Sequence, residues 1–221
     1  MKFVVLISFL LGLSWHSFSQ KKASYLAKRD VIIYESDNGS VYITKDKNCK
    51  LYEQLCPAFD AAIIRSFCTG TDTMQLQQHT IAVSRYWTDL YLYKGNYYVY
   101  APSDWMNNKP VYISDSILFD VSTDFTFYPI LESTNLGNGQ QFITINAGEI
   151  VKLTILPLKK IPGAAIWQIE TEKSIFYKLK VSSDAIKNFS MLVNDCLDEK
   201  CLNEFSFDEP DFSKLLKDSK N

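Results

Sequence analysis

Residues 91–100 read YLYKGNYYVY and place five tyrosines around a Lys-Gly-Asn turn. A two-residue loop at Gly95 and Asn96 predicts a β-hairpin. Tyr93 then faces Tyr98, and Tyr91 faces Tyr100. Because side chains alternate across a strand, the aliphatic side chains share one face, carried by Leu90, Leu92, Val99 and Ala101. The other face carries Tyr91, Tyr93, Tyr98 and Tyr100. We expect the aliphatic face to belong to the core.

The same alternation of apolar runs and turns extends over most of the chain. The runs are short and rich in β-branched and aromatic residues, as in DVIIYE, SVYITK, MQLQQHTIAVSRYWTDLYLY, PVYIS, SILFDV, FTFYPILE, QFITIN, IVKLTIL, AAIWQIE and IFYKLKV. About ten short strands at this spacing predict a mainly β fold, an antiparallel β-sandwich or barrel, with one or two short helices.

Two segments have helical character. SSDAIKNF (182–189) has Ser182 or Ser183 as a candidate cap, and DFSKLLKDS (211–219) is the second segment. Residues 49–68 are ambiguous between a short helix and a strand, because Pro57 interrupts a long helix.

The N-terminus has the pattern of a secretory signal peptide. Lys2 precedes an apolar run from Phe3 to Trp15, and small residues follow at Ser17 and Ser19. The run is shorter than the roughly 20 apolar residues that cross a bilayer. No later segment is long and apolar enough to span a membrane. The sequence therefore predicts cleavage of 1–19 near Ser19 and a secreted or periplasmic product. Residues 20–221 are expected to form a single mainly β domain, with a split into two smaller β domains near 103–110 as the alternative.

The charge pattern argues against nucleic-acid binding. The whole chain has a net charge of -2, and loss of Lys2 with the signal peptide brings it to about -3. Lysines and arginines are interspersed with acids, whereas a nucleic-acid binder clusters its basic residues. Aromatic content of 14% and charged content of 22% are those of a folded protein rather than a disordered one.

All five cysteines lie after the predicted cleavage site, where an oxidising compartment favours disulfides. A loop from Leu197 to Lys200 between two strand-like runs would bring Cys196 and Cys201 together, so we predict that disulfide. Any one pairing is possible among Cys49, Cys56 and Cys68. The chain has no pair of CxxC motifs, so the sequence predicts no zinc site and no other metal.

The candidate binding surface combines the tyrosine hairpin with the following loop, SDWMNNKP (103–110), which contains Trp105. A tyrosine ring is apolar while its hydroxyl stays hydrated, and this chemistry suits a glycan or a protein partner. The candidate ligand-binding residues are thus Trp105, Tyr91, Tyr93, Tyr98 and Tyr100. The alternative is structural: a second layer covers the tyrosines, and Trp105 folds back over the core.

Catalytic motifs are sparse. His79 is the one histidine left after export, and a strand histidine is more often a packing residue than a base. The sequence has no GxSxG, HExxH, P-loop or dinucleotide fingerprint, and it indicates no cofactor. A non-catalytic binding module is the favoured function. The alternatives are a glycosidase-type hydrolase with paired carboxylates and a β-barrel carrier of a small apolar ligand.

Overall fold

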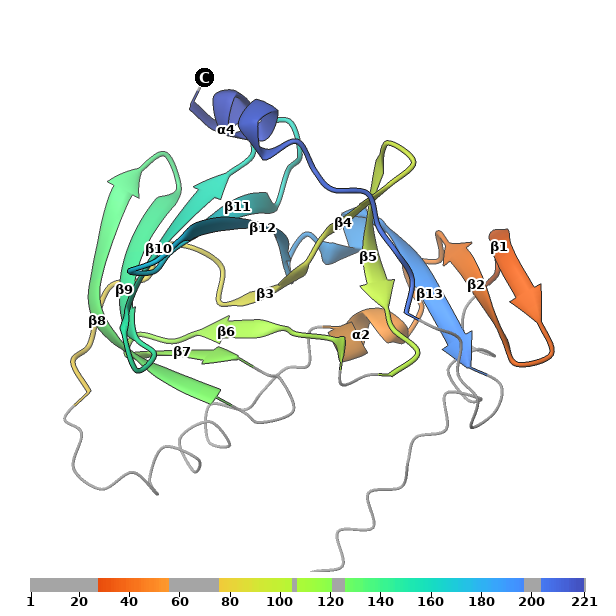
Figure 1. The fold of residues 1–221 in the computed structure, drawn as a ribbon, viewed down its shortest axis with the longest axis horizontal. Helices are drawn as coiled ribbons and strands as arrows, with labels where there is room; N and C mark the ends of the chain where they lie inside the picture. Colours follow the sequence, from red (N-terminus) through yellow and green to blue (C-terminus); the bar gives the residue numbers. More distant parts are fainter. Residues whose placement is uncertain (1–27, 56–75, 105–106, 121–125, 197–203, 221) are drawn as a thin grey trace, which may run out of the picture.

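Figure 1 shows the fold as a computed structural model, which describes residues 28–55, 76–104, 107–120, 126–196 and 204–220. In these ranges the strands are β1 (Val31–Ser36), β2 (Gly39–Thr44), β3 (Tyr86–Asp89), β4 (Tyr91–Tyr93), β5 (Asn96–Ala101), β6 (Val111–Ile113), β7 (Ile117–Asp120), β8 (Thr126–Gly137), β9 (Gln140–Asn146), β10 (Ile150–Pro157), β11 (Ala164–Glu170), β12 (Ile175–Ser182) and β13 (Ser190–Cys196). The helices are α2 (Leu51–Leu55), the 3-10 helix η2 (Ile186–Asn188) and α4 (Phe212–Lys220). The predicted mainly β fold with short helices is confirmed.

Eight strands close into a barrel in the order β10-β11-β12-β3-β6-β7-β8-β9. Neighbouring strands in this barrel run antiparallel. Closure removes the exposed strand edges that an open sheet of the same strands would have. Of the two predicted architectures, the barrel forms the larger part of the molecule.

Side chains fill the barrel. Trp87 of β3 and Trp167 of β11 meet edge to face, with ring centroids 5.7 Å apart. Aliphatic side chains from β6 to β11 complete this buried cluster, and Ile81 and Val83 pack against it from the segment before β3. The interior is therefore a packed core, as is usual for a barrel of eight strands.

The long predicted strand at residues 74–93 is wrong in its first half. Within its described part, residues 76–85 form no strand, and Ile81 and Val83 pack against the barrel core instead. Buried Gln141 replaces a strand partner there, because its Oε1 accepts the N–H of Ala82 at 2.9 Å and its Nε2 donates to Thr80 O. A single buried amide side chain thus satisfies backbone groups that the sequence pattern assigned to a ladder.

A second sheet of five strands, in the order β1-β2-β13-β5-β4, lies beside the barrel (Figure 1). β13 and β5 pair in parallel, with Ser190 opposite Tyr98 and Leu192 opposite Tyr100. The barrel is antiparallel as predicted, and this is the one parallel pair among the described strands. The long connection from β5 through the barrel to β13 makes parallel pairing possible.

The sheet and the barrel share a hydrophobic core. The chain passes from one to the other at Leu90, whose N–H donates to Leu179 O at 2.9 Å. Leu179 and Val181 of β12 pack in one cluster with Leu90, Val99 and aliphatic residues of β13. The face of the sheet that contains Val99 is thus buried against the barrel, as the sequence predicted for the aliphatic face.

The two predicted helical segments have different outcomes. α4 is confirmed at residues 212–220, and Asp211 Oδ1 accepts the N–H of Lys214 at 3.0 Å as its cap. Residues 186–188 form one 3-10 turn, which begins after Ala185 and has no side-chain cap. Ser182 is the last residue of β12, so neither it nor Ser183 caps this turn. Of the described helices, none combines the length and apolar content needed to span a membrane.

Candidate functional site

β4 and β5 form the predicted tyrosine hairpin in a different register. The turn residues are Lys94 and Gly95, with φ of 48° and 77°, and Tyr91 pairs with Tyr98. Positive φ at both central residues is the conformation of a type I′ hairpin turn. Asp208 supports this conformation, because its Oδ2 accepts the N–H of Lys94 at 2.7 Å. The predicted pairs were wrong by two residues, and a shift of two leaves every side chain on its predicted face.

The tyrosines lie on the outer face of the five-stranded sheet, opposite the face that packs on the barrel. Two phenylalanines from the chain before α4 pack onto them. We call these six residues the aromatic face: Tyr91, Tyr93, Tyr98, Tyr100, Phe205 and Phe207. Tyr100 is buried, and the other five rings are partly exposed. The aromatic face is therefore neither an open platform nor a closed core.

The rings of the aromatic face contact one another mainly by their edges. Tyr93 meets Phe205 at 76° with centroids 4.9 Å apart, and Tyr91 meets Tyr100 at 74°. Tyr91 and Phe207 are closer to parallel, at 31° and 4.3 Å. Edge-to-face packing is the favourable arrangement for neighbouring aromatic rings. In each such contact the edge of one ring covers one plane of the other.

Glu204 is a hydrogen-bonding hub at one end of the aromatic face. Its Oε2 accepts the hydroxyl of Tyr100, and its Oε1 accepts Ser103 Oγ at 3.0 Å and Asn107 Nδ2 at 3.1 Å. The Tyr100 hydroxyl in turn accepts the N–H of Phe205 at 3.2 Å. A carboxylate with several donors is held in a fixed position. Glu204 therefore ties both the loop after β5 and the segment with Phe205 to the sheet.

The two innermost tyrosines are neutral at physiological pH. Burial, with the hydrogen bond to Glu204, raises the pKa of Tyr100 above its ordinary value of 10.0. Burial, with the nearby charge of Asp89, raises the pKa of Tyr91 in the same direction. Their hydroxyls are thus hydrogen-bonding groups and are unsuited to act as general bases.

Replacing Tyr100 by phenylalanine is expected to destabilise the protein by about 2 kcal/mol, because Glu204 and the N–H of Phe205 lose a partner. Tyr98→Phe is the matched control. Tyr98 lies on the same strand and face, and no hydrogen bond of its hydroxyl is found in the part of the chain described by the structure. Urea unfolding of both variants gives the comparison. Equal stability of the two variants would contradict the role assigned to the Glu204 hub.

Two of the predicted site residues cannot be compared with the structure, and a third, Cys196, can. Trp105 and Cys201 fall outside the described residues. Cys196 is buried at the end of β13. The run around Phe205 lies across the outer face of the sheet and forms no strand with β13, so the hairpin expected on either side of the cysteines is wrong for residues 204–207. The Cys196–Cys201 disulfide itself stays a prediction.

The described histidine, His79, is held in structural contacts, and the described cysteine Cys49 is buried. His79 Nε2 lies 3.1 Å from Ile130 O, and the N–H of His79 donates to Asp115 O at 2.7 Å. Cys49 is a buried free thiol, and burial raises its pKa. A buried thiol with a raised pKa is a poor nucleophile. Within the described ranges, no group of three or more histidine, cysteine or acidic side chains is arranged to hold a metal ion.

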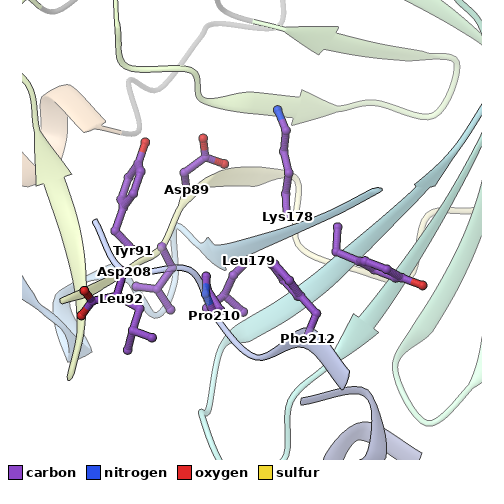
Figure 2. A pocket seen from close by; sticks show the side chains of 10 residues that line it. Asp89, Tyr91, Leu92, Lys178, Leu179, Asp208, Pro210 and Phe212 are labelled. Atoms are coloured by element: carbon purple, nitrogen blue, oxygen red, sulfur yellow. The ribbon is translucent and has the colours of Figure 1, made fainter. Parts of the chain in front are cut away.

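Figure 2 shows a cavity of about 240 Å³ between β4, β12 and the segment before α4. Two acids line it, Asp89 and Asp208, but in Figure 2 their carboxylates point away from each other. Asp89 Oδ1 accepts Lys180 Nζ at 2.5 Å, and Asp208 is bound to the hairpin turn. A glycosidase needs two carboxylates that converge on one bond. This arrangement does not supply them.

A second cavity, of about 390 Å³, lies between α4 and the loop after β10. Its apolar lining includes Leu92, Leu158 and Leu215, and Lys160 at its rim pairs with Asp218 at 2.7 Å. Neither cavity is lined by a residue of the tryptophan cluster that fills the barrel. A carrier of the predicted kind would instead hold its ligand inside the barrel.

Sequence reasoning missed Glu204, Phe205 and Phe207 as parts of the site. The signal was present as the alternating run Phe205-Ser206-Phe207, with two aromatic residues two positions apart. The run was assigned to a hairpin with β13, because a local partner is the simpler reading of a short apolar segment.

Comparison of the chain with protein-family models, with curated proteins and with solved structures finds no match. The assignment of function therefore depends on the geometry of the chain itself.

Proposed function

We propose that the protein is an exported, non-catalytic binding module that contacts a protein partner through the aromatic face. The mature chain begins at Gln20 and contains the Cys196–Cys201 disulfide. The observation that carries the proposal is the difference between the two faces of the five-stranded sheet. The barrel and α2 cover one face, whereas an extended segment with two phenylalanines crosses the other and leaves five rings partly exposed.

Partly exposed aromatic residues are typical of protein-binding surfaces. Tyrosine is enriched at interfaces, because its ring is apolar and its hydroxyl finds a polar partner. Lys94 adds a cation to this surface, with Nζ 5.1 Å from the centre of the Tyr93 ring. Such cation–π pairs at an exposed site contribute about 0.5 to 1 kcal/mol.

The charges beside the aromatic face favour a basic partner. Three exposed acidic residues lie close to Phe205 and Phe207 in the sequence: Glu204, Asp208 and Glu209. Complementary charge at the rim of an interface speeds association and selects the partner. The expected partner is a protein with an apolar patch bordered by lysine or arginine.

A protein is favoured over a glycan by the ring geometry. Sugar rings stack on a free aromatic plane, whereas Tyr91 with Tyr100 and Tyr93 with Phe205 meet edge to face, so that one plane in each pair is covered by its neighbour. Side chains of a protein partner can instead contact ring edges as well as ring planes. Of these two cavities, the one in Figure 2 reaches the aromatic face at Tyr91 alone and the other reaches none of its residues, which suits a flat interface better than a pocket for a small sugar.

Site-specific photo-crosslinking in the producing cell tests this proposal. A photoreactive amino acid is placed at Tyr98 in one sample and, as a matched control, at Ile175 on the barrel, which is 54% exposed. We expect a protein adduct of defined mass from position 98 and none from position 175. Export is tested in the same samples by intact mass. The recovered protein is expected to be lighter by the mass of residues 1–19.

Two results would overturn the proposal. One is the same adducts from both positions, or from neither. The other is a glycan-array signal of the purified protein that Tyr98→Ala removes, which would assign the surface to carbohydrate.

A further inference from the structure

One edge strand of the five-stranded sheet is covered by another segment of the chain, and the other edge strand is not covered within the described residues. At the β4 edge, the N–H of Asp208 donates to Leu92 O at 2.9 Å, and the two residues form an isolated bridge. The C-terminal segment thus covers that edge. At the other edge, β1 has β2 as its neighbour and no second strand within the described residues. Figure 1 places β1 at the side of the sheet farthest from the barrel.

The open edge is unusually apolar. Val31, Ile32 and Tyr34 are 48%, 51% and 52% exposed. Open edges in monomeric proteins normally carry lysine or proline, because unpaired backbone groups beside apolar side chains recruit another strand. β1 has neither residue in VIIYES, and a bulge between Ile32 and Tyr34 is its one protective feature.

The charges on β1 are complementary to those of a second β1. Arg29 and Glu35 each lie three residues from Ile32, on opposite sides of it. In an antiparallel pair with a two-fold axis near Ile32, the end of β1 that carries Arg29 lies beside the end of the other copy that carries Glu35, twice. Within one copy the two side chains already pair, with Arg29 NH1 3.0 Å from Glu35 Oε1, and both keep exposed surface for a second contact.

We propose that β1 pairs antiparallel with β1 of a second copy of this chain, so that two five-stranded sheets join into one continuous sheet. The two-fold axis then stands perpendicular to the sheet and leaves both aromatic faces on the same side. Two linked binding surfaces raise the apparent affinity for a partner with two sites. Because one strand pair buries less area than a standard interface, the dimer dissociates in about the micromolar range.

Sedimentation equilibrium of the mature protein over a range of concentrations tests this inference. Wild type is expected to shift from monomer to dimer, and Ile32→Lys to raise the dissociation constant at least about tenfold, since two lysines then meet at the axis. Ile175→Lys is the matched control, because Ile175 is equally exposed on a barrel strand. It is expected to leave the dissociation constant unchanged. Tyr34→Lys provides a second variant if Ile32→Lys does not fold.

Three outcomes would overturn the inference. The first is a wild type that stays monomeric up to about 100 µM, because an interface weaker than this is not specific. The second is a set of β1 variants that dimerise as strongly as wild type, and the third is an Ile175→Lys variant that loses dimerisation to the same extent as the β1 variants. Sedimentation tests the dimer, whereas crosslinking at Tyr98 tests binding of a partner by the aromatic face. A negative result in one experiment therefore leaves the other proposal standing.

Discussion

Replacing Gly163 by alanine is expected to lower the free energy of unfolding by about 4 kcal/mol, the largest effect of any single methyl group considered for this protein. Gly163 lies in the turn before β11 with φ of 82°, a backbone region that L side chains rarely adopt. A Cβ at this position would lie 1.9 Å from Ala185 Cβ, and Ala185 is buried. The variant therefore combines backbone strain with a steric clash that the packed neighbour cannot relieve.

Gly148→Ala separates these two effects. Gly148 has φ of 84°, and an added Cβ would meet nothing within 4 Å. Its cost is backbone strain alone, about 1 kcal/mol. The double variant Gly163→Ala with Ala185→Gly is expected to recover most of the clash energy. Thermal and urea unfolding measure all three, and equal losses for Gly163→Ala and Gly148→Ala would show that the turn before β11 is not packed as described.

Removing Asp89 is expected to cost about 3 kcal/mol, because it leaves the charge of Lys180 without a partner inside the barrel. The two residues face each other across β3 and β12, with Lys180 Nζ 2.5 Å from Asp89 Oδ1. The Lys180 side chain is 3% exposed, and its ammonium lies over the Trp167 ring. Asp89 is the one carboxylate paired with Lys180 among the described residues, and a cation that is so little exposed is costly once its partner is removed.

Asp89→Val combined with Lys180→Met is expected to remain within about 1 kcal/mol of wild type, since an apolar pair of similar volume replaces the ion pair. Glu170→Ala is the control, because Lys152 and Glu170 also face each other across barrel strands, but both are about half exposed. Its cost is expected below about 1 kcal/mol. Additive losses in the double variant would contradict the buried pair.

The mainly β fold is predictable because it depends on local patterns. Alternation along β9 to β12 is strong, and turns such as the one at Gly148 carry a glycine where positive φ is needed. Closure into a barrel is not local. It depends on β3 leaving the barrel at Leu90 and on Gln141 satisfying the backbone of residues 80–82, and neither contact has a signature in the sequence.

The candidate site was predictable in part for the same reason. Alternation alone assigned Tyr91 and Tyr98 to one face of the hairpin and Leu92 and Val99 to the other. A two-residue change in register does not alter this assignment. The cover over the tyrosines comes from Phe205, more than 100 residues later, through the bond to the Tyr100 hydroxyl. A contact at that separation is set by tertiary packing, which one sequence does not reveal.

The central claim is that the aromatic face binds a protein partner. Titration calorimetry with the partner captured by crosslinking tests it most directly, comparing wild type with Tyr93→Ala/Tyr98→Ala and with Ile175→Ala on the barrel. We predict at least about thirtyfold weaker binding for the double tyrosine variant and a change within about twofold for Ile175→Ala, as expected when two tyrosines anchor an interface. Unchanged affinity in the tyrosine variant, with its fold intact, would contradict the account.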